Sequence, residues 1–263
     1  MTRCDFATRF IVTGLLAAGL AGTAGAAEIK IAAPGSPPMF QQNGTGREAE
    51  IIARTLALCG DTVSFRVLPR GRHLEEYRDN ETIDAVATVA PGVPAPGFRS
   101  VTYIQYQNGA SVLKASGLKV TSLADLKGKR AVTFQGGKDI LPGLKDAAPG
   151  FAGLEEKSDQ LAHSKLLFAG RVDVVLSDGL IFAEYNRQLR EKRGEVDFDP
   201  AQEVVFTAIF PPTDYSLMFR KEVPRDNFNR CFGELSKTDA IDKINKAAIE
   251  PYRATVGKQY LNY

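Results

Sequence analysis

The chain has 263 residues, of which 44% are hydrophobic and 24% charged, and its formal net charge is +2. These proportions are those of a globular protein, and so balanced a charge offers no electrostatic case for nucleic acid or a membrane surface as partner. The two histidines, His73 and His163, lie far apart with no cluster of Cys or carboxylate residues around them. The sequence therefore gives no support for a zinc site and predicts no cofactor.

Residues 1–27 have the three parts of a secretory signal peptide. A basic start leads into the apolar stretch Phe10–Leu20 and then into small residues that offer a cleavage site near Ala26 or Ala27. The apolar stretch is shorter than the ~20 residues that a bilayer span needs. We therefore expect an exported, periplasmic protein with a cleaved leader. The alternative is a short membrane anchor that stays attached.

Strand-like and helix-like segments alternate behind this leader. Apolar and polar residues alternate over 62–68, as in a half-buried strand, whereas apolar residues recur at helical spacing over 48–58. By the same reasoning we expect strands at 28–33, 62–68, 83–89, 101–106, 110–113, 129–134, 172–176, 204–210 and 216–219, and helices at 48–58, 73–80, 122–128, from 136 onward, at 161–168, 179–193 and across 228–252. The pattern predicts an α/β fold with mostly parallel sheets, and the number of units predicts two lobes.

Five strings resemble one known family when they are taken in order. They are Pro37–Glu50, Ile83–Val86, Leu123–Lys129 followed by Val132–Gly136, Ala169–Asp178, and Tyr215–Lys221. Together they resemble the extracellular solute-binding proteins of family 3, the amino-acid class of ABC transporter substrate-binding proteins. This resemblance implies a periplasmic-binding-protein type II fold, with two crossover strands and a central ligand cleft. It places lobe 1 at 28–114 and 215–263 and lobe 2 at 115–214, with crossovers near 115–117 and 211–215.

Two cysteines remain once the leader is removed, Cys59 and Cys231. An even pair in an oxidising compartment is a disulfide candidate, and two buried free thiols are the alternative. The resemblance places both residues in lobe 1, which favours the disulfide.

Asp178 is the first candidate for a ligand-binding residue. It follows an apolar strand, where open α/β sheets place ligand groups. The family resemblance implies that this carboxylate accepts hydrogen bonds from a ligand α-ammonium. Alternatively, Asp178 caps the helix that begins at Gly179.

The loop after the strand 129–134 is the second candidate, with Phe134, Gly136, Gly137 and Lys138. Backbone N–H groups at a helix start favour an anionic group, and the two glycines allow close approach. The family usually has Ser or Thr here, so Lys138 is either a contact for a more acidic ligand or a solvated side chain.

Arg99 is the candidate for holding a ligand carboxylate, because the family uses an Arg before a Val-x-aromatic strand. Its spacing here is shorter than in the family. Thr88 and Val89 end the preceding strand and are expected to line the cleft. Arg70 and Arg72 form either a basic face for a carboxylate ligand or a solvated loop.

Phe40 is expected either as an aromatic lid over an apolar ligand portion or as a core residue. Asp214 and Tyr215 lie at the proposed hinge and are expected to line the cleft.

The leading hypothesis is a monomeric periplasmic solute-binding protein. It would capture a small amino-acid-like or carboxylate ligand and present it to the membrane permease of an ABC importer by hinge closure. The second is an accessory or sensor protein that serves a periplasmic redox enzyme or receptor. The third is a dehydratase-like enzyme; the sequence offers no paired acid and base, nucleophile–His arrangement or metal cluster for it, so we expect no enzyme activity.

Overall fold

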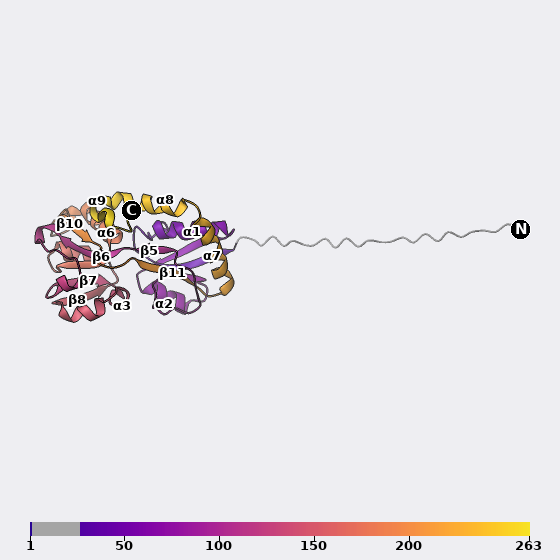
Figure 1. Ribbon diagram of the computed structural model, residues 1–263, viewed down its shortest axis with the longest axis horizontal. Helices are drawn as coiled ribbons and strands as arrows, with labels where there is room; N and C mark the ends of the chain where they lie inside the picture. The colour runs from indigo at the N-terminus through magenta and orange to yellow at the C-terminus, as the bar shows by residue number, and fades with distance from the viewer. Residues whose placement is uncertain (2–26) are drawn as a thin grey trace.

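The computed structural model describes Met1 and residues 27–263 (Figure 1). The expected signal peptide therefore lies, except for its two end residues, outside the described part of the chain. No helix among the described residues is long and apolar enough to cross a membrane.

The first sheet joins strands from the two ends of the chain. Its order is β2 (Thr62–Leu68), β1 (Glu28–Pro34), β3 (Ala85–Val89), β11 (Thr213–Phe219) and β4 (Phe98–Arg99), and β5 (Ile104–Tyr106) also pairs with β11. The first three strands are parallel, and β11 runs antiparallel to β3. The helices of this half are α1 (Arg47–Leu58), α2 (Arg72–Asp79), α7 (Glu222–Leu235) and α8 (Ala240–Ile249).

The second sheet has the order β10 (Val204–Thr207), β6 (Asn108–Leu113), β9 (Val174–Asp178), β7 (Arg130–Phe134) and β8 (Gly153–Lys157). Strand β7 is parallel to β8 and β9, while β6 is antiparallel to β9 and β10. The helices here are α3 (Gly137–Ile140), α4 (Leu144–Ala147), α5 (Leu161–Phe168), α6 (Gly179–Glu191) and α9 (Arg253–Val256). Figure 1 shows the two sheets in separate halves of the molecule.

This arrangement confirms the predicted two-lobed α/β fold. The central strands β3 and β9 are buried at every position, as near-continuous apolar runs predict for parallel strands covered on both faces. Strand β8 was not predicted, because its run Gly153–Lys157 holds two glutamates and is polar, as befits a strand at the edge of its sheet. The helical segment expected across 228–252 is divided between α7 and α8, with a turn at 236–239.

The first crossing between the sheets lies earlier than predicted. Strand β5 pairs with β11 in the first sheet, and β6 pairs with β9 and β10 in the second, so the chain crosses at Gln107 and not at 115–117. The predicted end of the first lobe segment at residue 114 therefore assigned β6 to the wrong sheet. Apolar alternation identifies a strand but not its partner, and only the pairing places it.

The end of the chain also departs from the predicted division. Helix α9 packs against α6 and β10 of the second half (Figure 1). Tyr252 donates a hydrogen bond to Glu184 at 2.7 Å, and Ala208 donates its backbone N–H to Gln259 at 3.0 Å. Residues 252–260 therefore connect the two halves, whereas the predicted division placed them in lobe 1 alone.

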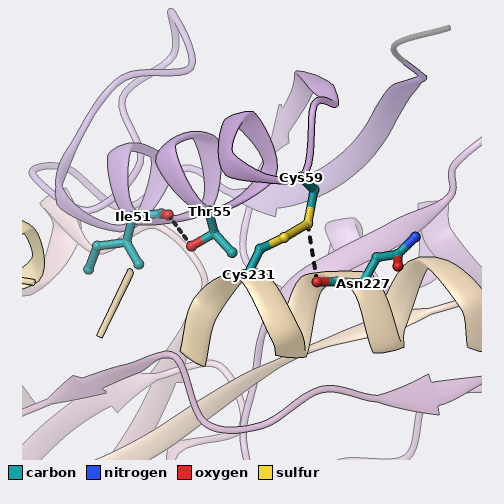
Figure 2. Close-up of a disulfide and its surroundings, with 5 residues drawn as sticks. All are labelled: Ile51, Thr55, Cys59, Asn227 and Cys231. Carbon is teal, nitrogen blue, oxygen red and sulfur yellow. Dashed lines mark hydrogen bonds between the residues drawn. A yellow bond between two sulfur atoms is a disulfide. The ribbon is translucent and has the colours of Figure 1, made fainter. Parts of the chain in front are cut away.

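The predicted disulfide between Cys59 and Cys231 is confirmed. It joins the end of α1 to α7, with Cα atoms 5.8 Å apart (Figure 2). The Cys59 sulfur also lies 3.1 Å from the backbone oxygen of Asn227, a contact rather than a hydrogen bond because a disulfide sulfur carries no proton. The alternative of two free thiols is wrong.

Candidate functional site

The carboxyl ends of the parallel strands of the two sheets face each other across a cleft. Gln160, which follows β8, donates a hydrogen bond to Ser36, which follows β1, at 3.3 Å. A cavity of about 460 Å³ lies between the loops after β2, β3 and β7. This volume is within the range of small-molecule sites. The lining residues are Arg70, Gly71, His73, Leu74, Thr88, Pro91, Gly92, Val93, Pro94, Gln135, Gly136, Asp139 and Ile140.

Arg70 is the buried cation of this cleft, with a relative exposure of 8%. It follows β2, and its guanidinium carbon lies 4.7 Å from the ring centre of Phe134, at the end of β7 in the other half. Its Nε donates to the backbone oxygen of Gln135 at 3.4 Å. Among the described residues no carboxylate lies within ion-pair distance of Arg70, so a buried positive charge faces the cavity without an anionic partner.

His73 lies beside Arg70 in the cavity wall and is only 1% exposed. Burial, together with the charge of Arg70, lowers its pKa to about 3, so the ring is neutral at pH 7. Its Nδ1 accepts the backbone N–H of Gly71 at 3.2 Å, which leaves the proton on Nε2. This Nε2 has no hydrogen-bond partner.

Thr88 lines the cavity with a backbone that few residues adopt. Its φ is 60°, in the left-handed region that disfavours β-branched residues. Its hydroxyl points away from a prospective ligand, because it donates to the carboxylate of Glu48 at 2.8 Å. Tyr103 and Tyr106 donate to the same carboxylate. Burial raises the pKa of Glu48, and these three hydroxyl donors oppose the rise.

Asp178 lies between the lobes and caps α6, as the alternative interpretation predicted. Its Oδ1 accepts the backbone N–H groups of Leu180 at 2.9 Å and Ile181 at 3.1 Å, and its Oδ2 accepts the Tyr260 hydroxyl at 2.6 Å. Burial raises the pKa of Asp178 to about 6 against these hydrogen bonds. The carboxylate borders a small space of about 10 Å³ with Tyr215, Phe134 and Arg70, and Arg70 also lines the larger cavity. The small space is large enough for about one water molecule.

The loop after β7 is built differently from the predicted anion site. Gly136 lines the cavity, but Gly137 packs on Thr133, since a Cβ atom at Gly137 would lie 2.4 Å from the Thr133 hydroxyl oxygen. The backbone N–H of Lys138 donates to the carboxylate of Glu156 at 2.9 Å. A side chain of the protein itself thus occupies this donor, and neither Gly137 nor Lys138 is among the cavity-lining residues.

Arg99 supports the cleft from outside. Its guanidinium donates to the backbone oxygens of Val89 at 3.0 Å and Val93 at 3.3 Å, which holds the proline-rich loop against β3. Burial lowers the pKa of Arg99. Neither Arg99 nor Val89 lines the cavity, and the side chain of Val89 is fully buried in the core.

The remaining candidates also divide between core and surface. Phe40 is fully buried and packs edge-on against Phe65, with ring centres 5.2 Å apart, so it is a core residue and not a lid. Arg72 is exposed and pairs with Glu75 at 2.6 Å. Tyr215 packs on Tyr106 and borders the small space beside Asp178, and it is not among the lining residues of the larger cavity. Asp214 accepts a hydrogen bond from Gln105 at 2.8 Å.

Sequence reasoning missed three residues of this region, His73, Glu48 and Tyr260. Nothing in the local sequence pattern identifies His73 or Tyr260, because each reaches the region through long-range packing. Glu48 stands in the first turn of α1, where an acidic residue is ordinary. Its burial beneath Thr88 appears only when β3 and β5 are packed together.

Comparison with solved structures finds the same two-lobed arrangement in proteins of low sequence identity. An ancestral arginine-binding protein bound to glutamine has a TM-score of 0.67 and 20% identity, covering 84% of this chain and 96% of its own. The amino acid ABC transporter substrate-binding protein AbpA from Streptococcus pneumoniae, bound to L-arginine, has a TM-score of 0.66 and 14% identity, covering 85% and 94%.

A histidine kinase sensor domain with similarity to periplasmic binding proteins has a TM-score of 0.64 and 17% identity, covering 84% of this chain and 95% of that domain. No model of a known protein family and no curated protein matches the sequence. The resemblance noticed in the sequence is thus confirmed in the fold.

Proposed function

We propose, from the two-lobed fold that this chain shares with periplasmic amino-acid-binding proteins, that it binds a small solute in the cleft between its lobes. The observation that carries the proposal is the cavity of about 460 Å³ at the carboxyl ends of both sets of parallel strands. Open α/β sheets bind ligands at this edge. Arg70, buried in that cavity without a carboxylate partner, supports an anionic group on the ligand.

The solute would be delivered to the permease of an ABC importer after lobe closure. The likeness to an ABC transporter substrate-binding protein supports this role. Two contacts already join the lobes across the cleft, one from Arg70 to Phe134 and one from Gln160 to Ser36. Closure of the lobes around a ligand would strengthen these contacts.

A sensor role is the second candidate. The likeness to a histidine kinase sensor domain favours it, since that domain has the same arrangement of lobes. Both roles need a bound solute but differ in the protein that receives the closed form. Capture of the ligand-bound protein on a purified permease, and not on a receptor domain, would separate the two.

A thermal-shift screen against amino acids, polyamines and dicarboxylates tests the binding function. A ligand at about 100 times its Kd should stabilise the protein by about 2.7 kcal/mol, or about 5–10 °C in Tm for a chain of this size. We expect Arg70→Gln to lose the response because it removes the buried charge from the cavity. The matched control is Arg72→Gln, two residues away and exposed, which should keep it. The proposal fails if no compound shifts the wild type or if Arg70→Gln responds fully.

A further inference from the structure

The cavity is lined by a buried positive charge and an exposed negative charge. Arg70 is 8% exposed, and its charge faces the cavity. The lining residue of opposite charge, Asp139, has a side chain that is 72% exposed and pairs with Lys145 at 3.0 Å. A buried charge without an ionic partner is costly unless something supplies one, whereas an exposed ion pair contributes little. The interior of the cavity therefore favours an anion.

Two buried side chains of the cavity wall are hydrogen-bond donors. Both Arg70 and the protonated Nε2 of His73 are donors, and the latter has no partner. On the first-lobe wall, Pro91 and Pro94 have no N–H, and their rings add apolar surface. A ligand group that accepts hydrogen bonds, such as a carboxylate, fits this end of the cavity.

The carboxylates around the cleft are already engaged. Asp178 accepts three hydrogen bonds and borders a space of only about 10 Å³, which shares Arg70 with the main cavity. Glu48 accepts the hydroxyls of Thr88, Tyr103 and Tyr106. Within the described part of the chain, an ammonium group placed in the cavity would find no buried carboxylate free to receive it.

The remaining walls are apolar. Leu74, Val93 and Ile140 line the cavity together with the two prolines, and they come from α2, from the loop after β3 and from α3. Apolar side chains on opposite walls favour an apolar ligand body, at about 25 cal/mol for each Å² that is removed from water.

We infer that the cleft selects a carboxylate with an apolar body and no ammonium group, such as an aryl- or alkyl-alkanoate, over the corresponding amino acid. This inference rests on the proposed solute-binding function. The carboxylate lies against Arg70 and His73, and the apolar body lies between the proline-rich loop and Ile140.

Isothermal titration with matched compounds tests the inference. The first set is 3-phenylpropionate, L-phenylalanine and 2-phenylethylamine, and the second is 4-methylpentanoate and L-leucine. We expect each carboxylate to bind at least tenfold more tightly than its amino acid, and the amine not to bind. Amino acids that bind as tightly as their deaminated partners would overturn the inference and leave the solute-binding function intact. If neither the carboxylates nor the amino acids bind, both proposals fail.

A charge variant at the rim gives an independent test of sign. Asp139→Asn removes a negative charge from the cavity edge, so it should tighten 3-phenylpropionate binding several-fold. The control is Asp146→Asn, the same change at an exposed residue that does not line the cavity; it should change affinity by less than twofold. Weaker binding in Asp139→Asn would mean that Asp139 holds a cationic group, which contradicts the inference.

Discussion

The carboxylate of Asp178 shows how one residue can serve a helix and still cost stability. It provides two hydrogen bonds to the first turn of α6, yet burial raises its pKa from an ordinary 3.8 to about 6. Because an acid with a raised pKa binds its proton more tightly in the folded state, its stabilising contribution is complete below about pH 3.8 and is lost as the pH rises through about 6. At pH 7 the carboxylate is ionised, and the folded state no longer gains from the tighter proton binding.

Asp178→Asn isolates this effect, since asparagine keeps an oxygen for the cap but cannot ionise. We compare the free energy of unfolding of the wild type with that of the variant. The difference, wild type minus variant, should rise by about 2 kcal/mol as the pH is lowered from 7.5 to 4.5. Urea denaturation at several pH values measures it. Using the difference removes the opposite contribution of His73 and His163, whose lowered pKa values of about 3 and about 4 destabilise the fold as the pH falls. A difference that does not change with pH would contradict the assignment.

At the scale of elements, the joint between α1 and α7 holds the two ends of lobe 1 together. The disulfide between Cys59 and Cys231 spans 172 residues of sequence, and the whole second sheet lies within that loop. Cys231 is buried, and the adjoining face of α7 packs Phe228 against Phe219 of β11. The cross-link therefore restrains the unfolded chain over 172 of its 263 residues.

We expect the double variant Cys59→Ser/Cys231→Ser to lose about 3–5 kcal/mol of unfolding free energy, because a long closed loop restricts the unfolded state. Denaturant titration measures the loss. Reductant should lower the unfolding midpoint of the wild type and leave that of the double variant unchanged. A wild-type midpoint that does not respond to reductant would refute a stabilising role.

At the scale of the whole molecule, the lobes share more than a cleft. One cluster of buried apolar residues runs from β1 and α1 to Leu180 and Ile181 of α6 and Phe206 of β10. The C-terminal residues 252–260 reach the second half through Tyr252, Gln259 and Tyr260. The lobes are thus coupled by packing as well as by two chain crossings.

This coupling predicts one cooperative unfolding transition, monitored by far-UV circular dichroism and by tyrosine fluorescence, which is usable because the chain has no Trp. Tyr260→Phe should lower the free energy of unfolding by about 1–3 kcal/mol, and with it the transition midpoint, because the buried Asp178 loses a hydrogen-bond donor. The transition should stay single. Two separate transitions in the wild type would show that the lobes fold independently.

Much of this architecture was predictable from local patterns. Apolar runs identified β3 and β9, helical spacing identified α1, and the cysteine pair predicted the disulfide, because each signal depends on neighbours in sequence or on residue type. The polar edge strand β8 and the crossing at Gln107 were not predicted, because the periodicity of a strand does not show which strands pair with it.

The sequence by itself determined an α/β chain of two lobes, because periodicity follows burial on each face, and its resemblance to the family 3 solute-binding proteins implied a cleft between them. Only the tertiary structure decided which candidates meet there. It placed Arg70, Thr88 and Gly136 in one cavity, turned Arg99 to the backbone of a loop, buried Phe40 and bound the Asp178 carboxylate to the Tyr260 hydroxyl. These outcomes depend on contacts between residues up to 82 positions apart, which no local pattern records.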